Sequence, residues 1–506
     1  MNNKPEYCIT DSLKILVGCT AILFIHLAAA ATGDGSKISI ELDVAHPGAM
    51  ISTNFAGLSF EGSLLLPNEN GIRYFRPDNQ PLINLFHTLG VRSLRIGGNT
   101  SDRDVKRLPE PADLDSLFAF ANKTDVKVIY CLQLHKGDPQ VAAQTVKYIM
   151  DHYAPLVDSF SIGQEPSAYP VTAVDSRPNN ERVGAGAEHF TYSNFAAEWK
   201  RFADAILAAV PEAQFCGPAV HKDPSWARNF IADFGRTNHV SLITEHLYAG
   251  GAGGKVPTPE IGRTRMLSDE FRQTYQSLYD GFVPMSVSNG LPYRLEEVNN
   301  FYNGGATNVS NTFASALWGL DFMHWWAEHG ATGLNFHTGD RVAAGSTLLP
   351  SKYTAFVSSR NGYEIRPLSY ALKAFELGGH GRIIPQSISN PEKLNVSAYA
   401  VLGDDQQLYL TVINKETGLT AKTASLAIEL NIVGFKRVET IRLLAPDNDV
   451  STTLSQTLGG EQIKEDGRWD EKWTTLKYSK SIGPANGIVR VEIPFASAMV
   501  VRFNHQ

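Results

Sequence analysis

The chain has 506 residues, more than a single compact core of about 100–200 residues requires, so at least two domains are expected. Its 43% hydrophobic and 19% charged residues are typical of a globular protein and exclude a disordered chain. The net charge of −7 is mild, and the sequence has no basic run of the kind that binds nucleic acid or a heparin-like polyanion.

The N-terminus has the order of a secretory signal: Lys4 and Lys14, an apolar run over 15–27, then small residues. The run is shorter than the roughly 20 residues of a transmembrane helix, so no membrane anchor is expected. Residues 1–31 are therefore predicted to be a signal peptide of a secreted or periplasmic protein. Cys131 and Cys216 lie in apolar runs and are expected to be buried thiols, with a disulfide as the alternative.

The alternating residues 37–44 predict a strand, and the segment 32–50 is expected to join a C-terminal β domain. Strands and helices then alternate over 51–378. The predicted strands are 56–61, 91–96, 126–134, 159–162, 214–220, 240–248, 291–300 and 333–337. The predicted helices between and after them are 80–89, 112–122, 139–152, 192–210, 226–234, 264–279, 311–329 and 367–377. This repeated alternation predicts an α/β fold, a parallel (β/α)8 barrel. Residues 169–186 and 250–259 read as loops.

The pattern changes from residue 379. Short alternating runs between turn signals predict an antiparallel β-sandwich over 379–506, packed on the barrel. These runs are 394–402, 407–414, 425–431, 437–444, 488–493 and 497–504.

Two predicted strands end in carboxylates. In Ser159-Phe160-Ser161-Ile162-Gly163-Gln164-Glu165-Pro166, proline ends the strand directly after Glu165. The strand over 291–300 carries Glu296 and Glu297 near its end. The carboxyl ends of barrel strands carry the chemistry of this fold, and paired carboxylates are what glycoside hydrolysis uses. For Glu165 alone, a solvated loop glutamate is an equally good interpretation.

The segments Ile-Gly-Gln-Glu-Pro and Glu-Val-Asn-Asn-Phe-Tyr-Asn-Gly-Gly resemble the acid/base and nucleophile segments of glycoside hydrolase family 79. That family includes β-glucuronidases and heparanases, and its two glutamates end strands 4 and 7 of the barrel. The resemblance implies that Glu165 is the acid/base and Glu297 the nucleophile of a retaining mechanism. Neighbouring strand residues point to opposite sides, so Glu296 is expected to face away from the substrate. Glu165 is expected to hold a proton near neutral pH.

The resemblance implies further substrate-binding positions: Glu61, Asn99, Gln164, His246, Tyr248, Tyr302, Gly304, His337 and Tyr353. Tyr248 would hydrogen-bond the nucleophile, although a buried structural tyrosine is the alternative; for Asn99 the alternative is a structural turn. Tyr302, Gly304 and Tyr353 would hold the sugar carboxylate without help from Lys or Arg. Gln164 departs from the family, which places Asn there. Arg95 is a candidate partner for a site carboxylate.

The sequence thus predicts an exo-β-glucuronidase that hydrolyses terminal β-linked glucuronic acid, with or without a 4-O-methyl group. It is expected to act as a monomer without cofactor or metal, with a glycan or glycoside as its partner. Two alternatives stay open: an endo-acting, heparanase-like enzyme, which needs a basic open cleft, and a carbohydrate-binding protein on an inactive barrel.

Overall fold

A computed structural model of the chain describes residues 36–169, 190–339, 350–430, 434–477 and 488–505. The predicted signal peptide, all but the first residue of the predicted loop at 169–186, and residues 340–349 lie outside these ranges. None of the described helices has both the length and the apolar character that a membrane span requires.

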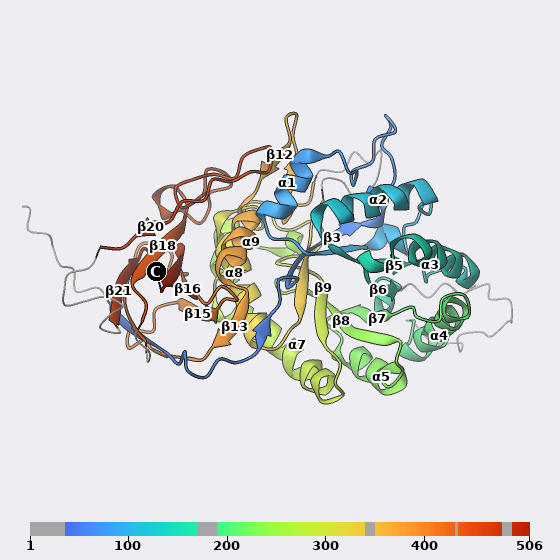
Figure 1. Ribbon diagram of the computed structural model, residues 1–506, viewed down its shortest axis with the longest axis horizontal. Helices are drawn as coiled ribbons and strands as arrows, with labels where there is room; N and C mark the ends of the chain where they lie inside the picture. The colour runs from blue at the N-terminus through green and yellow to red at the C-terminus, as the bar shows by residue number, and fades with distance from the viewer. Residues whose placement is uncertain (1–35, 170–189, 340–349, 431–433, 478–487, 506) are drawn as a thin grey trace, which may run out of the picture. The chain divides into compact units, whose positions relative to one another are not determined.

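Eight parallel strands close into a barrel in the order β10-β3-β4-β5-β6-β7-β8-β9, and helices surround it (Figure 1). The barrel prediction is therefore confirmed. The strands are β3 (Ala56–Glu61), β4 (Ser93–Gly97), β5 (Lys127–Leu132), β6 (Val157–Ile162), β7 (Phe215–His221), β8 (Val240–Tyr248), β9 (Tyr293–Asn299) and β10 (Gly333–His337). The helices are α1 (Gln80–Thr88), α2 (Pro111–Thr124), α3 (Pro139–Tyr153), α4 (Tyr192–Ala209), α5 (Pro224–Phe234), α6 (Pro259–Met266), α7 (Asp269–Ser288), α8 (Phe313–Glu328) and α9 (Pro367–Gly378).

The single helix predicted over 264–279 is wrong, because α6 and α7 divide this region. Ser268 separates them: its hydroxyl accepts the Phe271 N–H and caps a new helix. Pro284 lies inside α7 and does not end it. A short hairpin of β11 (Phe356–Ser358) and β12 (Tyr363–Ile365), which the sequence analysis did not anticipate, follows β10.

The C-terminal region forms two sheets. The smaller has the order β14-β1-β17-β21, and the larger β19-β18-β22-β16-β15-β13-β2 with β20 paired to β18. Their strands are β1 (Ser36–Leu42), β2 (Met50–Ile51), β13 (Gly381–Ile384), β14 (Gln386–Ser389), β15 (Val396–Leu402), β16 (Leu408–Asn414), β17 (Ala424–Leu430), β18 (Arg437–Leu444), β19 (Thr457–Leu458), β20 (Thr474–Thr475), β21 (Ile488–Ile493) and β22 (Ser497–Asn504). All pairs are antiparallel except β1 with β17, so the smaller sheet is mixed.

The larger sheet is apolar on both faces. Met499 and Val501 of β22 pack in the core between the two sheets, whereas Ala498 and Val500 belong to the barrel core. Helices α8 and α9 lie between the barrel strands and this sheet (Figure 1). Packing on both sides explains why fifteen of the sixteen residues of α8 are buried and most of them are apolar.

A buried ion pair lies in this joint. Asp321 of α8 accepts the Tyr399 hydroxyl (2.8 Å) and pairs with Lys415 (2.8 Å), where both charged side chains are about 5% exposed. Cys131 and Cys216 lie inside the barrel as buried free thiols, as predicted.

Candidate active site

A cavity of about 720 Å³ opens at the carboxyl ends of the barrel strands. Ten of the eleven predicted site residues line it: Glu61, Asn99, Gln164, Glu165, Tyr248, Glu297, Tyr302, Gly304, His337 and Tyr353. The eleventh, His246, is fully buried beneath the cavity and contacts Glu165. The fold therefore brings together residues from six strands and the loops that follow them.

Glu165 reaches the cavity because the chain leaves strand geometry at the end of β6. Gly163 and Glu165 have φ of 95° and 47°, and the Glu165 N–H donates to the Ala219 carbonyl of β7 (2.9 Å). A left-handed conformation costs a non-glycine residue about 1–2 kcal/mol. Such strain persists only where surrounding contacts enforce it, and it is common at functional sites.

Glu297 and Glu296 lie in a bulge of β9. Along β8, the pair Glu245↔Leu295 is followed by His246↔Glu297, so β9 skips one residue. Along β10, the pair Leu334↔Leu295 is followed by Phe336↔Val298, and β9 again has one residue more than its neighbour. Glu297 lines the cavity and Glu296 does not, so Glu296 faces away from the substrate, as predicted. Glu296 is buried inside the barrel and its Oε1 lies 3.4 Å from His246 Nε2.

Three side chains hold the Glu297 carboxylate. Arg95 donates to Oε2 (2.6 Å), Gln164 Nε2 donates to the same oxygen (3.0 Å), and Tyr248 donates its hydroxyl to Oε1 (2.9 Å). Arg95 also donates to Gln164 Oε1. Although burial raises the pKa of Glu297, the charges of His337, His246 and Arg95 lower it well below its ordinary value. Glu297 is thus ionised and oriented.

Arg95 fits beneath the cavity because Gly97 has no side chain. A Cβ on Gly97 would lie 2.1 Å from Arg95 Cζ. Gly97 therefore leaves space for the guanidinium. Gly98 (φ 74°) leaves space for the Glu61 carboxylate, because a Cβ on Gly98 would lie 2.4 Å from Glu61 Cδ.

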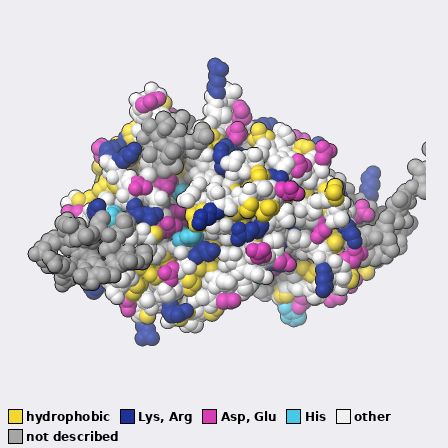
Figure 2. Space-filling model, turned by 180° about the vertical axis from the view of Figure 1, so that it is seen from behind, with side chains coloured by type: hydrophobic (Ala, Val, Ile, Leu, Met, Phe, Trp, Pro, Cys, Tyr) yellow, Lys and Arg dark blue, Asp and Glu magenta, His cyan; other side chains and the backbone are white. Residues whose placement is uncertain are grey.

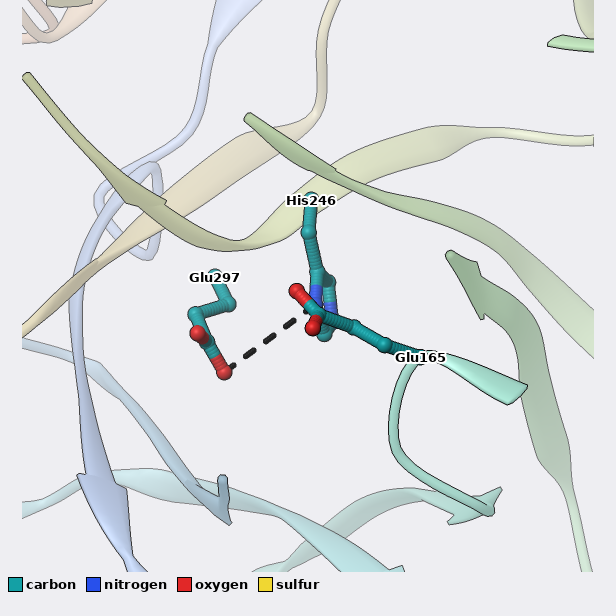
Figure 3. A group of neighbouring side chains, drawn as sticks. All are labelled: Glu165, His246 and Glu297. Atoms are coloured by element: carbon teal, nitrogen blue, oxygen red, sulfur yellow. Dashed lines mark hydrogen bonds and ion pairs between the residues drawn. The ribbon is translucent and has the colours of Figure 1, made fainter. Parts of the chain in front are cut away.

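His246 links the two catalytic candidates. Its Nδ1 lies 3.1 Å from Glu165 Oε1 and 4.0 Å from Glu297 Oε2, and Figure 3 shows the three side chains converging. Burial lowers the pKa of His246, but Glu297 and hydrogen bonds to Glu165 and Glu296 raise it to about 9. Burial raises the pKa of Glu165, but the hydrogen bond to His246 and the charges of His246 and His221 together lower it below its ordinary value. The expectation of a protonated Glu165 is thus wrong for the free site, where His246 holds the proton.

On the opposite side of the barrel, Glu61 and His337 meet. His337 Nδ1 lies 3.1 Å from Ser59 Oγ, and its Nε2 lies 3.6 Å from Glu61 Oε1. Glu61 accepts the Thr100 N–H (2.8 Å) and hydroxyl (2.6 Å). These contacts fix a carboxylate and an imidazole, two groups that bind sugar hydroxyls, at the cavity wall.

Tyr302, Gly304 and Tyr353 come from two loops that are tied together: the Lys352 N–H donates to the Gly304 carbonyl (2.6 Å). The rings of Tyr302 and Tyr353 lie 6.3 and 5.9 Å from that of Tyr248. Within the described parts of the chain, the Gly304 N–H has no hydrogen-bond acceptor. Lys352 lines the cavity beside these residues, so a cation is present where the sequence analysis expected none.

Two further residues of the site, Arg103 and His221, were not predicted. Arg103 lies in the cavity wall 3.3 Å from Glu165 Oε2 and donates to Asn99. The His221 ring lies 5.7 Å from that of Tyr302. His221 ends β7, so its place at a strand terminus was a usable signal. Arg103 and Lys352 lie in loops, and no strand pattern indicates their position.

The same acids meet the distance requirements of a metal site. Ligand atoms of Glu165, His246 and Glu297 all lie within 4.8 Å of one another. Arg95 already occupies one side of Glu297, and the raised pKa of His246 keeps its ring protonated near neutral pH. The Arg95 guanidinium repels a second cation, and an imidazole must be neutral to bind a metal, so both conditions oppose a metal ion.

Known proteins resemble this chain in sequence and in fold. Residues 113–324 match the N-terminal domain of glycosyl hydrolase family 79. A β-glucuronidase from Aspergillus niger is 22% identical over 97% of this chain and 98% of its own length. The structure of a 4-O-α-L-rhamnosyl-β-D-glucuronidase from Fusarium oxysporum 12S superimposes with a TM-score of 0.68 at 16% identity, covering 92% of this chain and 99% of that one.

A family 51 arabinofuranosidase from Xanthomonas axonopodis pv. citri shares the fold with a TM-score of 0.64, at 14% identity, covering 93% of this chain and 100% of its own. A parallel barrel with a β-sandwich and two carboxylates facing each other across the strand ends defines a glycoside hydrolase. In sequence, the chain resembles glycosyl hydrolase family 79.

Proposed function

We propose that the protein is a secreted, retaining exo-β-glucuronidase with Glu297 as nucleophile and Glu165 as acid/base. The observation that carries the mechanism is the separation of the two acids: a carboxylate oxygen of each lies within 4.8 Å of the other. Retaining glycosidases place their carboxyl groups about 5–5.5 Å apart, whereas inverting enzymes need about 6.5–9.5 Å to admit a water molecule.

The first half-reaction joins Glu297 to the sugar. Its ionised carboxylate attacks the anomeric carbon while the bond to the leaving oxygen breaks. The proton that this oxygen needs passes from His246 Nδ1 to Glu165 Oε1 over 3.1 Å, and from Glu165 to the leaving group. A bound substrate that excludes water favours the neutral form of Glu165. In the second half-reaction, Glu165 takes a proton from water, which displaces Glu297 and restores the anomeric configuration.

Recognition of a uronic acid is assigned to the loops after β9 and β10. The Tyr302 hydroxyl, the Gly304 N–H and Tyr353 supply donors on one side of the cavity, and Lys352 lies beside them. Hydrogen bonds from such donors to an ionised carboxylate are about twice as strong as those between neutral groups. Glu61 and His337 on the opposite wall would bind ring hydroxyls.

The relatives support the same substrate class. The Aspergillus niger relative is a β-glucuronidase and the Fusarium oxysporum neighbour is a rhamnosyl-β-D-glucuronidase. On the face shown in Figure 2, Lys and Arg lie interspersed with Asp and Glu, which gives no support to a heparin-like substrate there. Export rests on the signal-like order of residues 1–31, and N-terminal sequencing of the secreted protein tests it.

The function is tested with aryl β-glycosides that differ only at C5 and C6. We expect a strong preference for the glucuronide, with and without a 4-O-methyl group, and a β-anomer as the first product seen by NMR. Glu297→Gln should abolish turnover and keep the fold. Glu165→Ala should regain activity with azide and form a β-azide; an α-azide or an α-anomer would refute the assignment of roles.

A further inference from the structure

Asp102 is a buried carboxylate outside the cavity that joins the ends of three consecutive barrel strands. It follows β4 and is 1% exposed. One oxygen accepts the backbone N–H groups of Leu134 and His135, each at 2.7 Å, after β5. The other accepts the Gln164 N–H (2.8 Å), after β6, and the hydroxyl of Tyr169. All four donors are neutral groups.

The Gln164 bond bears directly on the acid/base. Gln164 stands between Gly163 and Glu165, which both have positive φ, so this short segment is held away from its relaxed conformation. Two backbone bonds act on it from neighbouring strands: Gln164 N–H to Asp102 (2.8 Å) and Glu165 N–H to Ala219 (2.9 Å). Gly163 has no side chain that could hold the segment by packing. A larger residue does not fit there, because its Cβ would lie 2.9 Å from the Tyr169 hydroxyl oxygen.

We infer that Asp102 is a positioning residue: it holds the Gln164 peptide, and through it the Glu165 carboxyl, in the geometry that protonates the leaving group. The nucleophile depends on it less: Gln164 also donates to Glu297, but Arg95 of β4 and Tyr248 of β8 hold that carboxylate independently of the Gln164 peptide. The inference rests on the proposed function in one respect, the role of Glu165 as acid/base.

The variant Asp102→Asn isolates this contact. Asparagine replaces one acceptor oxygen by an NH2 group. If the NH2 group faces Leu134 and His135, both of their N–H groups lose their acceptor, because a backbone N–H cannot accept a hydrogen bond. If the NH2 group faces Gln164 and Tyr169, only the Gln164 N–H loses its acceptor, because the Tyr169 hydroxyl can rotate and accept. The amide should therefore face Gln164, whose N–H then lacks its acceptor.

The experiment compares kcat/KM for phenyl and dinitrophenyl β-glucuronide, with active sites counted by covalent labelling with a 2-fluoro glucuronide. Asp102→Asn should lose about 100-fold on the phenyl substrate, as expected for a misplaced catalytic group. The loss on the dinitrophenyl substrate should be less than about fivefold, because a good leaving group needs little protonation. Equal losses, or none, would overturn the inference.

The matched control is Asp113→Asn. Asp113 is equally buried, accepts from Arg73 Nε (2.8 Å) and the Glu110 N–H (2.9 Å), and lies at the start of α2. It should lower the melting temperature without changing the ratio between the two substrates. If Asp102→Asn fails to fold, Tyr169→Phe decides: loss of one donor should cost about fivefold on the phenyl substrate only, and an unchanged ratio would overturn the inference.

Failure of the proposed function gives a different result. A wild-type enzyme that turns over no glucuronide refutes the glucuronidase assignment. The Asp102 comparison is then made with the phenyl and dinitrophenyl β-glycosides of whichever sugar the wild type accepts, where the same ratio change is expected.

Discussion

His246 touches both catalytic candidates, and this contact sets the expected pH dependence. The pKa of Glu297 is lowered, so protonation removes the nucleophile only as the pH falls well below 4.5. The proton needed by the leaving group is lost as the pH rises through the His246 pKa of about 9. The profile of kcat/KM against pH should be broad, with a basic limb near pH 9. Glu165→Ala should remove this limb for an activated aryl substrate; a limb near pH 6 would contradict the shared proton.

Tyr302 provides the test of sugar selectivity. Tyr302→Phe removes one hydrogen bond to an ionised carboxylate, worth about 1.5–3 kcal/mol, so turnover of an aryl β-glucuronide should fall accordingly. Turnover of the matched β-glucoside should stay nearly unchanged, because it has no carboxylate. The measurement is the kcat/KM ratio of the two substrates.

Tyr148→Phe is the control for this ratio, since its hydroxyl bonds Asp115 on the barrel exterior. Equal loss of both activities in Tyr302→Phe, or a wild-type ratio near one, would show that Tyr302 does not read the carboxylate.

Much of the site at this scale could be predicted because its residues end strands or follow a motif, as Glu165, Tyr248 and His337 do. The bulge of β9 at Glu296 and Glu297 could not, because a bulge depends on pairing with both neighbouring strands. The location of the proton could not be predicted either, since it depends on the contacts of His246 with Glu165 and with the distant pair Glu296 and Glu297.

Among the elements, the barrel strands follow from their buried apolar runs, and the helices from their spacing. The division of α6 from α7 did not, because a serine cap is a weak signal inside a long polar stretch. The strands β2, β19 and β20 have two residues each, too few for any alternation. Such short strands form only where a longer strand offers an edge.

Strand β3 shows how tightly the lower part of the barrel is filled. A Cβ on Gly57 would lie 2.3 Å from Asn335 Nδ2 and 2.8 Å from the Ser93 carbonyl. Gly57→Ala should therefore destabilise the protein by at least about 1–3 kcal/mol, since backbone of β4 cannot move aside. Gly254→Ala is the control, because nothing lies within 4 Å of its would-be Cβ. Thermal unfolding of both variants decides; equal melting temperatures would contradict the crowding.

At the scale of the molecule, the joint between barrel and sandwich contains the buried ion pair of Asp321 and Lys415. Lys415→Met leaves the Asp321 charge buried without its cation and should cost about 3–5 kcal/mol. The exposed pair of Lys422 with Glu392 is the control, and Lys422→Met should cost less than about 1 kcal/mol. The measurement is the free energy of unfolding in denaturant.

This pair also makes stability depend on pH. The pKa of Asp321 is lowered from 3.8 by Lys415, despite burial, which raises it. A lowered carboxyl pKa stabilises the folded state above the unfolded value, and this stabilisation is lost as the pH falls through the folded value. Wild type should therefore lose the contribution only below about pH 4. Equal acid sensitivity of wild type and Lys415→Met would contradict the role of the pair.

The position of β1 has a consequence for biosynthesis. Its two neighbours in the sheet are β14 and β17, and Ser36 pairs with Ala424. At 5–20 residues per second, a ribosome needs about 20–80 s to reach that partner after β1 emerges. Both edges of β1 stay open until β14 is made, and one edge stays open until β17 is made, while the barrel can already form. Ribosome-bound chains that stop before residue 386 should therefore recruit chaperones at β1, and chains in which β17 has also emerged should release them.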